Sequence, residues 1–320
     1  MSHDLWLLFG IGFLYLGLLF VIAHAGDSGR IPERLIRHPL TYVLSLGVYA
    51  TTWTFYGSVG FAKTQGYLFL TIYLGVTLAF ALTPILFQPL LRLTREYQLT
   101  SLADLFAFRY RSQLAGILVT LFMLVGTLPY IALQIRAVTD SLQMISHTVA
   151  PRILALIFCS TLVVFAILFG ARHSTSREKH RGLVLAIAFE SIVKLVALLV
   201  IGLVTLFGVF DGFSGLDKWL AAHPEMLDRL YQPVREGPWS TLLLLAFAAA
   251  FLLPRQFHML FAENLEPKAL KTATWGFPLF LLLINLPIPL ILWGGEALGL
   301  SMPPDYFALG ITLDQGPSWL

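Results

Sequence analysis

Charged residues are scarce in this chain. Asp, Glu, Lys and Arg make up 12% of its 320 residues, whereas a soluble domain carries about 25%. Hydrophobic residues reach 57% and lie in long continuous runs. These features exclude an ordinary soluble domain and predict an all-α polytopic membrane protein. The 17 prolines and the non-alternating runs argue against a membrane β-barrel.

Cysteine and enzyme motifs are also nearly absent. The single cysteine, Cys159, excludes a disulfide within the chain and a metal site built on cysteine. No HExxH, P-loop, GxSxG or kinase signature is present. Glu190 is the only acid deep inside an apolar run, which disfavours an intramembrane enzyme with paired acids. The chain therefore offers no catalytic residue.

Eight apolar segments are long enough to cross the ~30 Å hydrocarbon core of a membrane. They lie near residues 5–24, 40–62, 66–91, 113–135, 153–170, 183–210, 240–262 and 274–294. The connections on one side carry 14 of the 21 Lys and Arg residues, and those on the other side carry six. The positive-inside rule places the basic set in the cytoplasm and the amino terminus outside. The first segment lacks the basic start of a signal peptide and is expected to be retained.

Two connections have helical patterns. Ser101 and Asp104, after the third segment, have the spacing of a capping box, which predicts a short cytoplasmic helix. Leu216, Trp219 and Leu220, between the sixth and seventh segments, recur at i, i+3 and i+4. This spacing predicts an amphipathic helix on the outer side.

Helix breakers interrupt two segments that are five apart in order. Three glycines interrupt the second segment, and Pro254, with Arg255 and Gln256 beside it, interrupts the seventh. Paired breaks of this kind point to an inverted-repeat transporter whose site lies at the breaks. A repeat of five plus five segments needs three more after the eighth, so the chain is expected to be a fragment. The expected parts are an extra helix and loop (1–39), a first repeat (40–210), an outer loop (211–239) and an incomplete second repeat (240–320).

The stretch beginning at Tyr49 combines hydroxyl groups with aromatic rings. A helix broken inside hydrocarbon leaves carbonyls unpaired, and carbonyls with nearby hydroxyls suit a small hard cation. The rings of Tyr49 and Trp53 suit a solute. Helix packing through small residues, with Thr and Ser bonded back to the backbone, explains the same composition equally well.

Glu190 and Lys194 stand at i and i+4 inside the sixth segment. Charges inside a membrane are costly and point to function by default. Their spacing fits a structural ion pair, and an ion or proton path near the cytoplasmic side is the alternative. His258, after the second break, is expected to be a satisfied histidine rather than a proton relay.

Several motifs resemble the sodium/solute symporter family. They are TSLADLFAFRY after the third segment, RGLVLAIAFES entering the sixth and LPRQFHMLF closing the seventh. The extra first segment ahead of a broken one is similar to the family layout. The segment YATTWTFYGSVGFA resembles the corresponding segment of a subgroup in which a symporter-like membrane part precedes a cytoplasmic sensor histidine kinase.

The resemblance implies a leucine-transporter-type inverted-repeat fold with one extra N-terminal helix, here truncated after the seventh core helix. It implies a cation site at the backbone carbonyls of Gly47 and Ala50, with Thr51 adjacent. It also implies that Glu190, near Lys194, lines the inner ion exit. The implied solute contacts come from Tyr49, Trp53, Tyr73 and the break at Pro254. Ala246 and Ala250 depart from the family, which often places aromatic gate residues there.

The expected function is cation-coupled transport, with sodium as the cation, of a small polar solute such as an amino acid or a carboxylate. The alternative is a solute-sensing input domain of a histidine kinase with little or no transport. The expected location is a bacterial inner membrane, and the expected partners are lipid, the solute and a kinase domain in the full-length chain. No nucleic acid, no transition metal and no cofactor beyond a sodium ion are expected.

Overall fold

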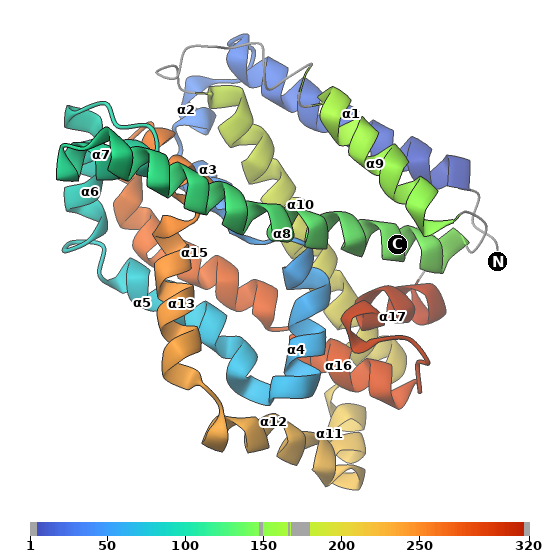
Figure 1. Ribbon diagram of the computed structural model, residues 1–320. Helices are drawn as coiled ribbons and strands as arrows, with labels where there is room; N and C mark the ends of the chain where they lie inside the picture. Colours follow the sequence, from blue (N-terminus) through green and yellow to red (C-terminus); the bar gives the residue numbers. More distant parts are fainter. Residues whose placement is uncertain (1–4, 147–149, 166, 168–179, 317–320) are drawn as a thin grey trace.

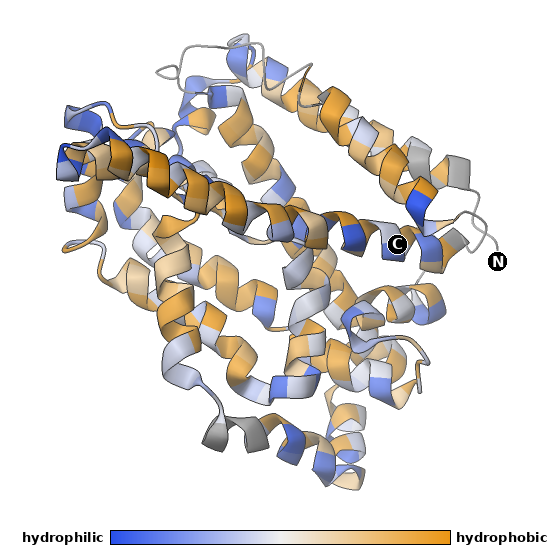
Figure 2. Cartoon of the chain, in the orientation of Figure 1, coloured by the Kyte–Doolittle hydropathy of each residue, from blue (hydrophilic) through white to orange (hydrophobic). Residues whose placement is uncertain are grey.

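The computed structural model describes residues 5–146, 150–165, 167 and 180–316, and every regular element among them is a helix (Figure 1). Two long helices, α1 (Leu5–Asp27) and α8 (Gln113–Ser146), leave their apolar surfaces open. In their most apolar windows, 6% of the residues of α1 and none of those of α8 are buried. Figure 2 shows apolar residues along both. Such surfaces are stable in lipid rather than in water, so the chain is an all-helical membrane protein.

Fewer helices than the eight expected are long and apolar enough to span a membrane by themselves. Five described helices do so, or six if a bent pair counts as one span. The described helices Pro39–Tyr49 and Pro151–Val164, which fall in the second and fifth predicted segments, are each shorter than a full span, and the eight-span count stays a prediction. The apolar stretch Trp53–Ala81 is turned at Gly66, whose φ is +52°. Residues 166 and 168–170 of the fifth predicted segment lie outside the described residues.

The first broken helix comprises α3 (Pro39–Ser45), η1 (Leu46–Tyr49), η2 (Trp53–Gly57) and α4 (Ser58–Gln65). Pro39 starts α3, and proline suits this position because its ring fixes a helical φ and the first residue of a helix needs no N–H donor. The break itself lies at Ala50, where the backbone becomes extended with ψ of 117°. The following Thr51 is outside any helix.

The second broken helix comprises α13 (Trp239–Leu252), α14 (Pro254–Phe257) and η6 (His258–Ala262), with a bend of 51°. Leu253 is extended, with ψ of 134°. Proline clashes with a helical conformation in the preceding residue and lacks an N–H, so the helix stops there and restarts at Pro254. The predicted break is thus confirmed.

Helices of the two predicted repeats pack directly against each other. α5 (Leu70–Ala81) lies along α13, and α15 (Ala269–Asn285) lies against α3 and α5. A Cβ on Gly75 of α5 would come within 2.6 Å of the Ala246 Cβ of α13. That close crossing explains why position 246 holds alanine where the resemblance implies a large ring. On the other side of α3 lies α10 (Arg181–Val204), which also packs against α1.

The predicted connecting helices are present. In α7 (Leu102–Tyr110), the Asp104 N–H donates to Ser101 Oγ and the Ser101 N–H donates to the Asp104 carboxylate, so the capping box is confirmed. The outer connection forms two helices, α11 (Phe213–Ala222) and α12 (Pro224–Glu236). The remaining elements are α2 (Glu33–Ile36), η3 (Gly66–Phe69), α6 (Phe87–Glu96), α9 (Pro151–Phe165), η5 (Thr205–Val209), α16 (Ile288–Ala297), η7 (Pro304–Tyr306) and α17 (Phe307–Gln315).

Candidate functional site

The predicted cation ligands lie at the first break. Gly47 is buried in η1, and its carbonyl accepts the Ala50 N–H at 2.9 Å within the last turn before the break. Ala50 is buried and extended, so its own carbonyl leaves the helical ladder. The Thr51 N–H donates to Thr54 Oγ1 at 3.3 Å. The break therefore takes the Ala50 carbonyl out of the helical hydrogen-bond ladder.

Lys194 donates a hydrogen bond to that carbonyl. Its Nζ donates to Ala50 O at 2.9 Å and lies 2.7 Å from Glu190 Oε1. Glu190 and Lys194 thus form the ion pair that their spacing predicts, and Lys194 also contacts Ala50, one of the predicted cation ligands. The meeting depends on Gly47, because a Cβ there would lie 2.4 Å from Ser191 Oγ on α10. The absence of a side chain lets α10 approach the break.

Two glutamines also hold the broken helix. Gln134 of α8 accepts from the Thr52 N–H at 3.0 Å and from the Thr52 hydroxyl at 2.6 Å. Gln256 of α14 is buried, and its Nε2 donates to Leu46 O at 3.2 Å. Backbone groups inside a membrane need such partners. The role of Gln256 could have been suspected from the sequence, because it stands close to Pro254 at the predicted break. No sequence feature marks Gln134 in this way.

The four predicted solute residues have different packing partners among the described residues. Tyr49 meets Phe277 edge-on at 6.3 Å, and Trp53 packs near Phe61 at 6.2 Å. Tyr73 is partly buried against the core. Pro254 is exposed at the start of α14 and serves to bend the helix. No ring contact or hydrogen bond among the described residues links Tyr73 to the other three predicted residues.

Arg255, next to that proline, is the charged group at the second break. The charge count above assigned Arg255 to the connection after the seventh segment, but the structure places it within the bent helix pair α13–α14. Its guanidinium lies over the Tyr130 ring of α8 at 4.4 Å, within electrostatic range of Tyr49. Arg255 Nε and the Tyr130 hydroxyl are both shielded from solvent, and neither has a hydrogen-bond partner in the described part of the chain. A cation and a hydroxyl in this state can receive an anionic group.

A second polar cluster joins η6 to the start of α10. Glu263 is 2% exposed, and its Oε1 lies 2.8 Å from His180 Nδ1 and 3.0 Å from His258 Nε2. Its other oxygen accepts the His180 N–H at 2.9 Å. Burial alone would raise the pKa of the Glu263 carboxyl, but the hydrogen bonds from His258 and His180 outweigh it and lower that pKa. Two histidines and a carboxylate are also the donor types of a zinc site, a set that the sequence did not predict.

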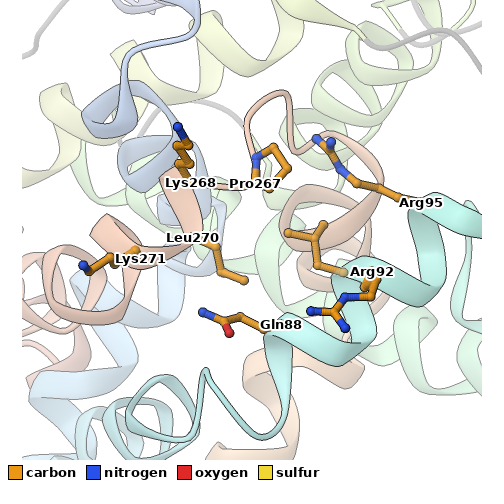
Figure 3. A pocket seen from close by; sticks show the side chains of 8 residues that line it. Gln88, Arg92, Arg95, Pro267, Lys268, Leu270 and Lys271 are labelled. Atoms are coloured by element: carbon orange, nitrogen blue, oxygen red, sulfur yellow. The ribbon is translucent and has the colours of Figure 1, made fainter.

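A pocket of about 600 Å³ opens elsewhere, between the end of α6 and the start of α15 (Figure 3). Its polar lining is mainly basic, from Arg92, Arg95, Lys268 and Lys271. None of the predicted site residues lines it. The two breaks, with their freed backbone groups and half-buried charges, are therefore the better candidate for a solute site.

Fold and site together define an all-helical membrane protein with two broken helices and half-buried charged residues at the breaks. Among curated proteins, the chain is similar to the uncharacterized symporter YhjB of Bacillus subtilis (strain 168), with 26% identity over 270 residues. The match covers 82% of this chain and 51% of that protein, so the chain spans about half the length of this relative. No family model and no solved structure matches the chain. The similarity supports a symporter-like family and suggests solute transport.

Proposed function

We propose that this chain is the membrane module of a cation-coupled secondary transporter for a small polar solute that bears a carboxylate, such as an amino acid or a carboxylic acid. The observation that carries the proposal is the stacking of the half-buried Arg255 on Tyr130 at the second break, where the solvent-shielded Arg255 Nε and Tyr130 hydroxyl lack partners among the described residues. A carboxylate would satisfy both atoms through charge-assisted hydrogen bonds. Alternating access in a leucine-transporter-type fold would move the broken helices around this point.

Solute binding by the full-length protein tests this proposal. The probes are labelled acetate, proline and histidine, with labelled glycerol as the uncharged comparison. Arg255→Gln should weaken carboxylate binding roughly 10- to 100-fold, because a hydrogen bond to a charged group contributes about 1.5–3 kcal/mol. Arg136→Gln is the matched control, since the Arg136 side chain is 78% exposed. Equal binding by the two variants would contradict the proposal.

The second candidate function is sensing, with the same module as the input domain of a histidine kinase in a bacterial inner membrane. The observation that favours it is the set of side chains from α8, α10 and α14 that hold the first break. A solute that binds two arrangements of these helices differently would shift their populations. Autophosphorylation of the full-length protein that follows solute concentration, without uptake, would favour sensing over transport.

A further inference from the structure

The pocket between α6 and α15 is lined, among the described residues, by four basic residues and no acidic one (Figure 3). Arg92 and Arg95 come from α6, and Lys268 and Lys271 come from the start of α15. The buried Leu270 adds an apolar part to the lining. The volume of about 600 Å³ lies in the range of pockets that bind small molecules.

The four charges of the pocket lack partners of opposite sign. Among the described residues, no ion pair involves any of them. Glu266, two residues before Lys268, pairs with Arg37 at 2.9 Å instead. Arg95 donates to Asn264 O at 2.6 Å, but its Nε is shielded from solvent and has no hydrogen-bond partner in the described part of the chain. Uncompensated cations around one pocket favour an anionic ligand, and Arg and Lys both bind phosphate oxygens.

The pocket lies at the end of a membrane-spanning stretch. α15 opens the apolar stretch Ala269–Ala297, which is long enough to cross a membrane. Trp275 stands one turn in from Lys271 and is 58% exposed, and Leu279, a further turn in, is 44% exposed. Lysine, then tryptophan, then leucine on one helix face is the order expected from the headgroup level of a bilayer to its acyl chains. The pocket therefore opens beside a surface that suits lipid.

We propose that this pocket binds the phosphate of an anionic phospholipid, whose acyl chain lies along the exposed face of α15 at Trp275 and Leu279. Basic pockets between membrane helices suit such headgroups. A free phosphate ester offers the same anionic group, but it has no apolar part for the adjoining face of α15. The lipid would join α6 of the first predicted repeat to α15 of the second. The pocket lies apart from both breaks, so this proposal does not depend on the proposed function.

Bromine atoms on an acyl chain quench nearby tryptophans, which makes Trp275 a reporter for the lipid. Purified full-length protein in detergent micelles is titrated with brominated phosphatidylglycerol, or with brominated phosphatidylcholine as the zwitterionic comparison. Each protein is measured with and without Trp275→Phe, so that the difference gives the quenching of Trp275 itself. We expect phosphatidylglycerol to half-saturate this signal at a mole fraction about tenfold lower than phosphatidylcholine does.

The pocket variant combines Arg92→Gln with Lys271→Gln. It should raise the half-saturating fraction of phosphatidylglycerol about 30-fold, because each basic side chain beside an anionic lipid contributes about fivefold. Arg30→Gln with Arg34→Gln is the matched control, since it removes two exposed charges from another basic connection, and it should bind like the wild type. Arg92→Lys with Lys271→Arg keeps both charges and should bind clearly better than the pocket variant, which guards against a variant that fails to fold.

Four results would overturn the proposal. Equal quenching of Trp275 by the two lipids would show that the headgroup is not recognised. An equal effect of the Arg30 and Arg34 control would show that net charge alone attracts the lipid. Equal loss in the charge-conserving variant would show that packing rather than charge sets the binding. Displacement of phosphatidylglycerol by soluble glycerol 3-phosphate at matched ionic strength would assign the pocket to a free phosphate ester instead of a lipid.

Discussion

Single long polar side chains decide how the first broken helix is held. Gln134, Lys194 and Gln256 each reach one backbone group near the break from a different helix. The position of Lys194 inside an apolar segment and its pairing with Glu190 could be predicted, because both depend only on nearby residues in the sequence. Its contact with Ala50 could not be predicted, since it depends on how closely α10 packs against η1. That closeness comes from Gly47, a residue whose absent side chain gives no signal of its own.

Glu263 is a buried acceptor for several donors, and its removal should destabilise the protein. Glu263→Ala leaves the His180 N–H and two rings without their acceptor, which costs about 1–3 kcal/mol for each buried unsatisfied donor. Because the pKa of Glu263 is lowered from 4.5, its stabilisation is present above that value and is lost as the pH falls toward the lower folded pKa. Unfolding midpoints at pH 7 and pH 4 should therefore differ more for wild type than for Glu263→Gln. Glu266→Gln, at a 40% exposed side chain, should behave like wild type.

At the scale of elements, the two breaks were predictable to different degrees. Pro254 imposes its break through covalent geometry, so the sequence locates it to the residue. The first break falls at Ala50, whereas Gly57 and Gly60 lie inside helical turns. Glycine permits a break without requiring one, and the partners of the freed carbonyls come from distant helices. The resemblance therefore indicated Ala50 better than the local composition did.

The contact of η1 with α10 can be tested by a pair of complementary substitutions. Gly47→Ala places a Cβ 2.4 Å from Ser191 Oγ and 2.8 Å from Ser191 Cβ. Overpacking of this kind typically costs about 1–3 kcal/mol. Ser191→Gly removes both clashing atoms, so the double variant should recover most of the loss in unfolding midpoint. Additive losses in the double variant would show that the two helices do not meet at this point.

At the scale of the whole molecule, the two sets of connections separate to opposite ends. Arg37 pairs with Glu266 and Arg181 pairs with Glu33, each within 3.1 Å, which joins three of the basic connections. Figure 3 shows basic residues of the fourth, from α6, beside those of α15. At the other end, Lys63 pairs with Glu296, and the Tyr306 hydroxyl donates to Asp140 at 2.9 Å. The alternation inferred from charge counts is thus matched by contacts that no count could reveal.

The charge asymmetry predicts that the basic end faces the cytoplasm, and this prediction is open to direct measurement. Cys159→Ser gives a background free of cysteine. In it, Ser28→Cys marks the basic connection after α1, and Ser214→Cys marks α11, both at exposed positions. In right-side-out membrane vesicles, a membrane-impermeant maleimide should label Ser214→Cys at once and Ser28→Cys only after permeabilisation. Labelling of Ser28→Cys in intact vesicles would reverse the orientation.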